Sequence, residues 1–292
     1  MSEPRDRFAG GATPRVPPGR SVRLPGGNSF VREAAGPPGA PTVVLLHGLF
    51  ATTSMNWPYA FDALSPHFRV LALDHRGHGR GIKTYRQFRL EDCADDVVAL
   101  ADALGIGQVI PVGYSMGGPV ALLARKRHRH RVAGMVLCAT SAVFGSEAEE
   151  SSSGLADMFG VALRLTPPVV RQSMMRAVIS ASRDRGYLPA GFADEARHHD
   201  PAAMVEARRA VARFDARPWV ESLGGPAAVV LTARDRLVPA ERQMALARAT
   251  RASVHQVDAD HDVAVRHPRR FLPALVDACR AVARQASTAM PA

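Results

Sequence analysis

The sequence contains few cysteines and few aromatic residues, and each scarcity narrows what the protein can be. Only three of its 292 residues are cysteine, and 6% are Phe, Trp or Tyr. The cysteines are far apart and odd in number, which argues against a disulfide framework or a cysteine-based zinc site. We therefore expect a reducing compartment and three packing residues, Cys93, Cys138 and Cys279.

Long hydrophobic runs are also missing. No uninterrupted apolar stretch approaches the roughly 20 residues that cross a bilayer, although apolar residues make up 47% of the chain. Residues 1–20 are rich in Pro, Gly and Arg and lack the apolar core of a secretory signal. These features predict a cytoplasmic globular protein that begins with a flexible tail over residues 1–20.

Positive charge exceeds negative charge, with 37 Lys and Arg against 27 Asp and Glu and a formal net charge of +10. Most basic residues are scattered, and only Arg125–Arg131 forms a block. No DNA- or RNA-binding motif accompanies this block, so we expect no specific nucleic-acid partner. We interpret the block as a solvated turn and keep a weak contact with an anionic surface as the alternative.

Short apolar segments rich in Val and Leu recur along the chain, as is typical of strands buried on both faces. A hairpin pattern over residues 21–33 precedes them, and helical patterns alternate with them. The predicted strands are residues 41–48, 68–74, 109–113, 132–138, 227–233 and 253–257, and the clearest helices are residues 90–104 and 268–284. This alternation predicts an α/β fold with a mostly parallel, doubly wound sheet.

The alternation stops between residues 145 and 220, where no buried strand is evident. Helical patterns fill this region, and the best of them begins with Asp200 as N-cap and Pro201 in the first turn. Its apolar stripe consists of Met204, Ala207, Val211 and Phe214. The predicted organisation is a core of residues 21–144 and 221–292 with an inserted helical cap of residues 145–220.

The segment Gly-Tyr-Ser-Met-Gly, residues 113–117, lies where a predicted strand passes into a helix. The two glycines remove Cβ atoms that would crowd a serine in strained backbone geometry. A helix N-terminus also offers N–H groups to a developing negative charge. We interpret Ser115 as a nucleophile on a strand-to-helix turn, with an ordinary turn serine as the alternative.

A serine hydroxyl needs a base, and the base needs a group that orients it. Asp235 follows the predicted strand 227–233, and His261 follows the strand 253–257. The order serine, acid, histidine is the one expected for this kind of turn. Competing residues in the same segments are Asp260, Asp262, His255 and His267.

Residues His47 and Gly48 follow the predicted strand 41–48 and allow a close turn of the backbone. We expect the backbone N–H groups of Leu49 and Met116 to form an oxyanion hole beside Ser115. The sequence has no P-loop, no Gly-x-Gly-x-x-Gly and no cluster of metal ligands, so neither a cofactor nor a metal is expected.

The segments "HGLF", "DHRGHGRG", "GYSMGG", "TARDRLVP" and "ADHDVAVRHP" together resemble the α/β-hydrolase fold superfamily. The resemblance covers roughly residues 21–143 and 223–285. It implies the same triad of Ser115, Asp235 and His261. It also implies a structural role for residues 74–81, with Asp74, His75, Arg76 and His78 as loop-fixing residues. The family often has glycine where this chain has Asp260.

These features predict a serine hydrolase that cleaves a carboxylic ester, or a thioester, of a hydrophobic to medium-sized acyl group. Alternatives on the same triad are a C–C bond hydrolase, a lactonase and a cofactor-free perhydrolase. Outside catalysis, a small-molecule binding protein and a binder of anionic membranes or nucleic acids remain possible classes. The candidate substrate-binding residues are Tyr114, Met158, Phe159, Met174 and Met175.

Overall fold

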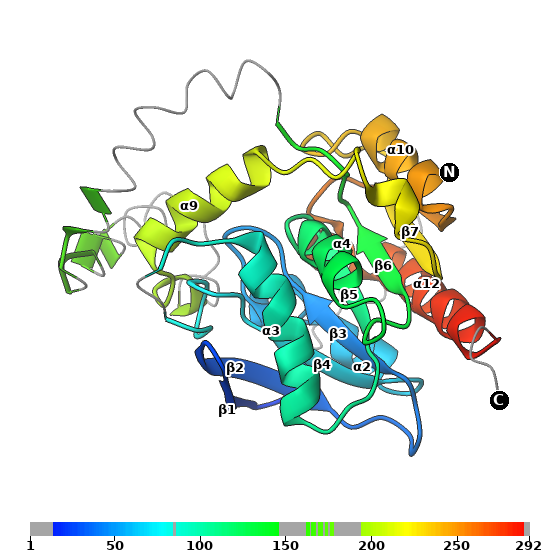
Figure 1. The fold of residues 1–292 in the computed structure, drawn as a ribbon, viewed down its shortest axis with the longest axis horizontal. Helices are drawn as coiled ribbons and strands as arrows, with labels where there is room; N and C mark the ends of the chain where they lie inside the picture. The colour runs from blue at the N-terminus through cyan, green and yellow to red at the C-terminus, as the bar shows by residue number, and fades with distance from the viewer. Residues whose placement is uncertain are drawn as a thin grey trace, which may run out of the picture.

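An eight-stranded sheet forms the centre of the computed structural model (Figure 1). The structure describes residues 14–83, 86–145, 162–163, 165–167, 169–171, 173–174, 176–177 and 194–288. The strand order is β1-β2-β4-β3-β5-β6-β7-β8. The strands are β1 (Gly19–Leu24), β2 (Gly27–Ala34), β3 (Thr42–Leu46), β4 (Arg69–Leu73), β5 (Ile110–Tyr114), β6 (Met135–Cys138), β7 (Ala227–Thr232) and β8 (Ser253–Val257).

The six strands β4, β3, β5, β6, β7 and β8 run parallel to one another. The hairpin of β1 and β2 extends one edge, where β2 pairs antiparallel with β4. This sheet confirms the predicted mostly parallel α/β fold. The hairpin begins at Gly19, slightly before the predicted start at residue 21. The described helices are α1 (Thr53–Asn56), α2 (Ala60–Leu64), α3 (Leu90–Ala103), α4 (Gly117–Arg127), α9 (Pro201–Ala212), α10 (Ala240–Thr250), α11 (Val263–Arg266) and α12 (Pro268–Thr288), with a 3-10 turn at Val220–Ser222.

Helices cover both faces of the sheet, which explains why the strands are apolar without interruption. In β3, Val44 and Leu46 pack in the layer that contains α3, α4 and α10. Their neighbours Val43 and Leu45 point to the opposite layer, which contains α2 and α12. The three cysteines are free and buried within these two layers, as predicted. Among the helices that the structure describes, none is both long and apolar enough to cross a membrane.

Helix α9 begins as the sequence predicts. The Asp200 side chain accepts the N–H groups of Ala202 and Ala203 at 2.9 and 3.3 Å, and Pro201 occupies the first turn. The predicted apolar stripe is buried, and α9 lies across the top of the molecule in Figure 1. The division into core and cap stays a prediction, because much of residues 146–193 lies outside the described part of the chain.

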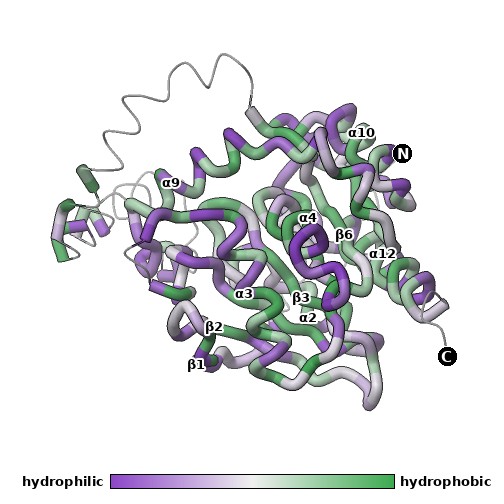
Figure 2. The backbone as a smooth tube through the Cα atoms, viewed as in Figure 1, coloured by the Kyte–Doolittle hydropathy of each residue, from purple (hydrophilic) through white to green (hydrophobic). Residues whose placement is uncertain are grey.

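The basic block at the end of α4 lies against neighbouring loops and appears as a hydrophilic segment in Figure 2. The Arg127 guanidinium forms two hydrogen bonds to the Asp95 carboxylate, at 2.8 and 2.9 Å. Three further arginines donate to backbone carbonyls: Arg125 to Val132, Arg129 to Ser222, and Arg131 to Gly107. These contacts favour the structural interpretation of the block, and contact with an anionic surface stays a prediction.

Candidate active site

Ser115 lies between β5 and α4 in a backbone conformation that L-residues rarely adopt, with φ of 51°. The flanking glycines are required by close packing. A Cβ on Gly113 would lie 2.2 Å from the Gly117 carbonyl oxygen, and one on Gly117 would lie 2.2 Å from that of Leu46. The Ser115 N–H donates to the Cys138 carbonyl at 3.0 Å, which fixes the turn to β6. The turn therefore presents the serine above the carboxyl ends of the strands.

The structure brings Ser115, His261 and Asp235 together although they are far apart in the sequence. The Nε2 atom of His261 lies 3.1 Å from Ser115 Oγ, and its Nδ1 lies 2.8 Å from Asp235 Oδ2. Because a carboxylate only accepts, Nδ1 carries the proton and Nε2 is free to accept the serine hydroxyl. This arrangement of nucleophile, base and orienting acid is the one that activates a serine.

The Asp235 side chain is fully buried but well supplied with donors. Its Oδ2 accepts the Thr232 hydroxyl at 2.7 Å, and its Oδ1 accepts the N–H groups of Leu237 and Val238 at 2.9 and 2.8 Å. Burial alone would raise the pKa of Asp235. The hydrogen bond and charge of His261 and the Val238 amide outweigh burial and hold this pKa below its usual value.

The two aspartates beside His261 have other partners. The Asp260 carboxylate accepts the backbone N–H of His261 at 2.8 Å and that of Arg236 at 3.1 Å. These bonds and the Arg236 side chain lower the pKa of Asp260 to about 2. Asp262 pairs with Arg266 at 2.5 Å. Asp260 thus ties the loop that carries His261 to the loop that carries Asp235.

The other two candidate histidines lie away from Ser115. The ring of His255 is within β8, where its Nε2 lies 3.3 Å from Ser253 Oγ. His267 follows the last residue of α11. Neither lines the cavity that contains Ser115, so within the described chain only His261 has the geometry of the base.

Residues 47–51, here called the oxyanion loop, are held in place by hydrogen bonds of the His47 and Asn56 side chains. The His47 Nε2 atom accepts the His75 backbone N–H at 3.0 Å, so its Nδ1 carries the proton and donates to the Gly48 carbonyl at 2.8 Å. The Gly48 N–H in turn donates to Asn56 Oδ1 at 2.8 Å. The Gly48 amide is therefore occupied, and the next free amide along the loop is that of Leu49.

The two predicted oxyanion donors belong to residues near Ser115. Leu49 lines the same cavity as Ser115, and Met116 follows Ser115 at the N-terminus of α4. Within the described residues neither backbone N–H donates to a protein acceptor. Phe50 has φ of 59°, which turns the loop sharply after Leu49. The oxyanion hole stays a prediction that this geometry supports.

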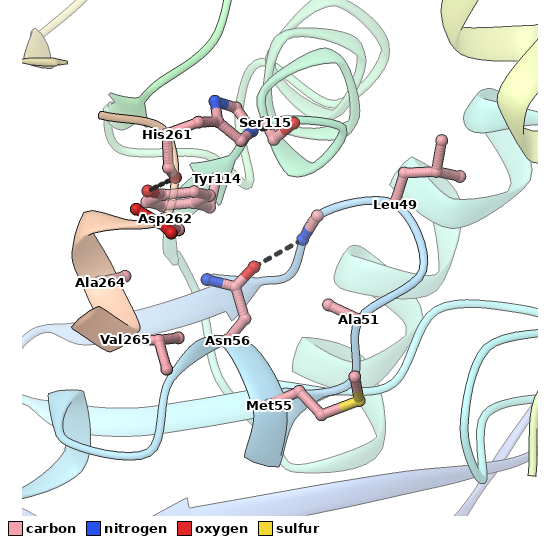
Figure 3. A pocket seen from close by; sticks show the side chains of 11 residues that line it. Leu49, Ala51, Met55, Asn56, Tyr114, Ser115, His261, Asp262, Ala264 and Val265 are labelled. Atoms are coloured by element: carbon pink, nitrogen blue, oxygen red, sulfur yellow. Dashed lines mark hydrogen bonds between the residues drawn. The ribbon is translucent and has the colours of Figure 1, made fainter. Parts of the chain in front are cut away.

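A cavity of about 180 Å³ opens beside Ser115 and is mostly apolar (Figure 3). Its other lining residues are Gly48, Leu49, Ala51, Met55, Asn56, Tyr114, His261, Asp262, Ala264 and Val265. Of the predicted substrate-binding residues in the cap, Met174 is 45% exposed and does not line this cavity. Met158, Phe159 and Met175 lie outside the described residues.

The fifth predicted substrate-binding residue is Tyr114. It lines the cavity, but its hydroxyl points toward the backbone of His261. This hydroxyl donates to the His261 backbone carbonyl at 2.5 Å (Figure 3). The ring packs edge-on against Trp57, with centroids 5.7 Å apart. Burial raises the pKa of Tyr114 well above its usual value, so the hydroxyl stays protonated. Tyr114 therefore stabilises the loop that carries His261.

Residues 74–81 form a loop next to the site, and their side chains fix its position, as predicted. Asp74 accepts the Thr53 N–H at 2.9 Å with one carboxylate oxygen and the Arg80 N–H at 3.0 Å with the other. The Arg76 guanidinium grips the Asp96 carboxylate through two bonds of 2.6 and 2.7 Å. These contacts join the loop to α1 and α3.

Four buried histidines, here called the histidine cluster, pack beneath the oxyanion loop: His47, His75, His78 and His199. The rings of His47 and His75 lie 4.4 Å apart, and those of His78 and His199 lie 5.6 Å apart. Burial lowers the pKa of all four, that of His199 to about 4. Among the described residues no group of three or more metal-binding side chains is arranged to hold an ion. Sequence patterns revealed neither His199 nor Asn56, because neither belongs to a motif.

Comparison with known proteins adds an independent finding. A sequence profile described as alpha/beta hydrolase fold matches residues 41–179. A dihydrolipoyllysine-residue acetyltransferase component of an acetoin cleaving system from Pseudomonas putida is 30% identical over 71% of this chain. A candidate non-heme haloperoxidase of Mycobacterium phage D29 is 30% identical, over 76% of this chain and 81% of its own length.

Solved structures show the same likeness over almost the whole chain. The crystal structure of the enol-lactonase from Burkholderia xenovorans LB400 superimposes with a TM-score of 0.71 and 26% identity, over 89% of this chain and 100% of that one. In contrast, the match to the Pseudomonas acetyltransferase component spans 55% of that protein's length. That relative therefore informs the fold of the shared part more than the activity of the whole.

Proposed function

This chain belongs to the alpha/beta hydrolase fold family, and from that premise we propose that it is a serine hydrolase of carboxylic esters or thioesters. One observation carries the proposal. Ser115 Oγ lies 3.1 Å from the nitrogen of His261 that is free to accept its proton, and Asp235 holds the opposite ring nitrogen at 2.8 Å. Proximity of this kind is what nucleophilic catalysis by serine requires.

In the acylation step, His261 Nε2 takes the hydroxyl proton while Ser115 Oγ bonds to the acyl carbon. The electron pair of the carbonyl moves to its oxygen, which accepts the N–H groups of Leu49 and Met116. One such donor contributes a factor of about 10² to 10³ to kcat. When the carbonyl re-forms, the leaving oxygen or sulfur departs with the proton that His261 had taken, and an acyl-serine remains.

In the deacylation step, water replaces the departed alcohol or thiol. His261 takes one proton of the water while its oxygen bonds to the acyl carbon. The bond to Ser115 Oγ then breaks, and the proton on His261 returns to that oxygen. The products are a carboxylic acid and the free serine. Asp235 stays ionised and stabilises the protonated ring in both steps.

The cavity favours an acyl group of hydrophobic to medium size. Its walls next to Ser115 are formed largely by the apolar residues Leu49, Ala51, Met55 and Val265. A second candidate substrate is a lactone, favoured by the likeness to the Burkholderia enol-lactonase. Opening a lactone is the same acyl transfer, except that the leaving oxygen stays attached to the product.

Labelling with a fluorophosphonate tests the proposal directly. We expect one adduct on Ser115, mapped by mass spectrometry, which is abolished in Ser115→Ala and reduced at least a hundredfold in rate in His261→Ala. His255→Ala serves as the matched control, because this histidine lies outside the site and the variant should label normally. A folded protein that forms no adduct would refute the serine mechanism and favour a binding protein.

A panel of substrates then resolves the bond that is cleaved. Matched aryl esters, thioesters and lactones of the same acyl groups are compared by kcat/KM. We expect ester or thioester turnover that disappears in Ser115→Ala. Turnover confined to lactones would instead support the second candidate.

A further inference from the structure

Asn56, at the end of α1, is held in a single orientation inside the active site. The residue is 7% exposed, and its Oδ1 accepts the Gly48 N–H at 2.8 Å. Helix α1 is itself anchored where Thr53 donates its N–H to the Asp74 carboxylate at 2.9 Å. A side-chain amide carries an acceptor on one side and a donor on the other. The bond from Gly48 therefore decides that Nδ2, the donor, faces away from the oxyanion loop.

The Nδ2 atom of Asn56 faces the cavity. Figure 3 shows it on the side of Ala264, opposite the bond to Gly48. Asn56 and Ser115 line the same cavity. Within the described residues Nδ2 donates to no protein acceptor and is not one of the fully buried polar atoms, so it is open to the cavity. A Cβ on Gly48 would lie 3.3 Å from Ser115 Cβ and 3.4 Å from Asn56 Oδ1, so Asn56 and Ser115 both adjoin Gly48. A ligand that displaces water from this cavity without supplying an acceptor would leave the donor unpaired, whereas a ligand with an oxygen in reach would keep it bonded.

The surroundings of this donor select among acceptors. The nearby walls contributed by Ala51, Met55 and Ala264 are apolar. The charged group that also lines the cavity is the Asp262 carboxylate, whose partner is Arg266 at 2.5 Å. Arg266 pairs with this carboxylate, and none of the lining residues is Lys or Arg, so an anionic acyl group would lose hydration without gaining a cationic partner. A neutral oxygen is therefore a better match for Nδ2 than an acidic group.

We propose that Asn56 is a specificity-determining residue, which donates from Nδ2 to a neutral oxygen on the acyl group of the substrate. The preferred acyl group is short and carries a ketone or ether oxygen a few bonds from the scissile carbonyl. This inference rests on the proposed function, since it concerns the acyl side of the same reaction. In this proposal Asn56 has two roles: its Oδ1 atom holds the oxyanion loop, and its Nδ2 atom recognises the substrate.

The wild-type protein is tested first, with aryl esters in matched pairs. One pair is 4-oxopentanoyl against 4-methylpentanoyl, and the other is 3-oxobutanoyl against 3-methylbutanoyl, so a carbonyl oxygen replaces a methyl group of similar size. Each kcat/KM is divided by the rate of alkaline hydrolysis to remove differences in intrinsic reactivity. We expect a preference of about tenfold for the oxo ester in at least one pair. No preference in either pair would overturn the inference.

The charge of the acceptor is tested with the 3-carboxypropanoyl ester, in which a carboxylate oxygen replaces the terminal methyl of the 4-oxopentanoyl ester. We expect this anionic ester to react at least tenfold more slowly than the ketone, because its carboxylate would lose hydration in a cavity whose lining has no Lys or Arg. A faster reaction of the anionic ester would overturn the assignment of a neutral acceptor.

The variant Asn56→Asp separates the two tasks of the residue. It keeps an oxygen for the Gly48 N–H and removes the donor, so the oxo preference should fall to about one. Met55→Leu is the matched control, which changes an apolar wall residue and should alter both esters of a pair alike. If Asn56→Asp does not label with fluorophosphonate, the wild-type pairs decide alone. A wild-type protein without a Ser115 adduct refutes the proposed function, whereas a labelled Ser115 without an oxo preference refutes only the role of Asn56.

Discussion

His261 and the histidine cluster lie near the same oxyanion loop but have different partners. The ring of His261 lies between the Asp235 carboxylate, at 2.8 Å, and the Ser115 hydroxyl, at 3.1 Å. In the cluster, His47 bonds only backbone groups, and its ring lies 4.4 Å from that of His75. Among the described residues no carboxylate accepts a hydrogen bond from a ring of the cluster.

The difference shows that the surroundings of an imidazole ring set its protonation and therefore its role. A buried imidazole that lacks an ionised partner stays neutral, because burial disfavours the charged form. In the cluster this burial lowers the pKa of His199 to about 4. A ring that faces a carboxylate can instead take up a proton during the reaction, since the negative charge stabilises it. His261 is thus suited to be a base, and the cluster to be a neutral support.

The largest effect is expected for Asp235→Asn, which removes the carboxylate from the Nδ1 atom of His261 and so makes this ring resemble those of the histidine cluster. We expect kcat to fall about 10⁴-fold, because an amide favours the wrong tautomer and leaves the protonated ring unstabilised. The measurement is kcat on whichever ester the wild-type protein hydrolyses best. Thr232→Val is the control, since it removes one bond to Asp235 but keeps the carboxylate. A loss below tenfold in Asp235→Asn would mean that another acid orients the base.

The neutral state of the cluster predicts that acid destabilises the fold. An unfolded histidine takes up its proton near pH 6.5, whereas His199 in the fold does so near pH 4. Between these values the unfolded state binds more protons, so stability is full above about pH 6.5 and is lost as the pH falls. His199 alone would account for roughly 2 kcal/mol of the free energy of unfolding between pH 7 and pH 5.

Urea denaturation at pH 7 and pH 5 measures this loss. His199→Asn keeps an acceptor where the His199 Nδ1 atom accepts the Gly79 N–H at 2.8 Å. The variant should therefore show a smaller drop in stability between the two pH values. His130→Asn, at an exposed histidine, should behave like the wild type. An equal drop in all three proteins would contradict a neutral cluster.

Tyr114→Phe tests how far the position of His261 depends on the hydrogen bond to its backbone carbonyl. It removes the 2.5 Å hydrogen bond from the tyrosine hydroxyl to the His261 carbonyl and leaves the ring in place. We expect kcat to fall roughly three- to tenfold while KM stays nearly constant, because the bond positions the base and not the substrate. A change confined to KM would show instead that the hydroxyl acts on the substrate.

The smallest effect is expected for Asp260→Gly, which restores the residue common in the family. The Asp260 carboxylate accepts the backbone N–H groups of His261 and Arg236 at 2.8 and 3.1 Å from a partly exposed position. Water can replace these bonds, so kcat should fall less than about threefold. Because the pKa of Asp260 is about 2, the effect should be the same at pH 5 and pH 8. A loss above tenfold would place Asp260 among the residues on which the base depends.

Much of the architecture could be predicted from local patterns in the sequence. Strands covered on both faces must be apolar throughout, so β3, β5 and β7 are visible as continuous hydrophobic runs. The Gly-x-Ser-x-Gly turn is similarly local, because its glycines are required within a few residues of Ser115. The short helices α1 and α11 carried no such pattern, since four residues are too few to show a period.

The choice among like residues depended on three dimensions. Chain order favoured Asp235 over the competing Asp260 and Asp262, and the structure shows that only Asp235 meets the Nδ1 atom of His261. The reason is that the ends of β7 and β8 lie side by side in the sheet, whereas Asp260 bonds the backbone N–H of His261 and Asp262 pairs with Arg266. The same holds for Met174, which an apolar pattern suggested for the pocket and which is 45% exposed.

Local patterns were enough to predict the sheet, the turn at Ser115 and the chain order of Ser115, Asp235 and His261, because each depends on periodicity or on neighbours along the chain. Three features became visible only in the folded chain: the orientation of Asn56, the hydrogen bond from Tyr114 to the His261 carbonyl, and the packing of four neutral histidines. Each of these depends on a hydrogen bond or a ring contact between segments that are distant in sequence. Such contacts have no period and no fixed spacing, so only the folded chain reveals them.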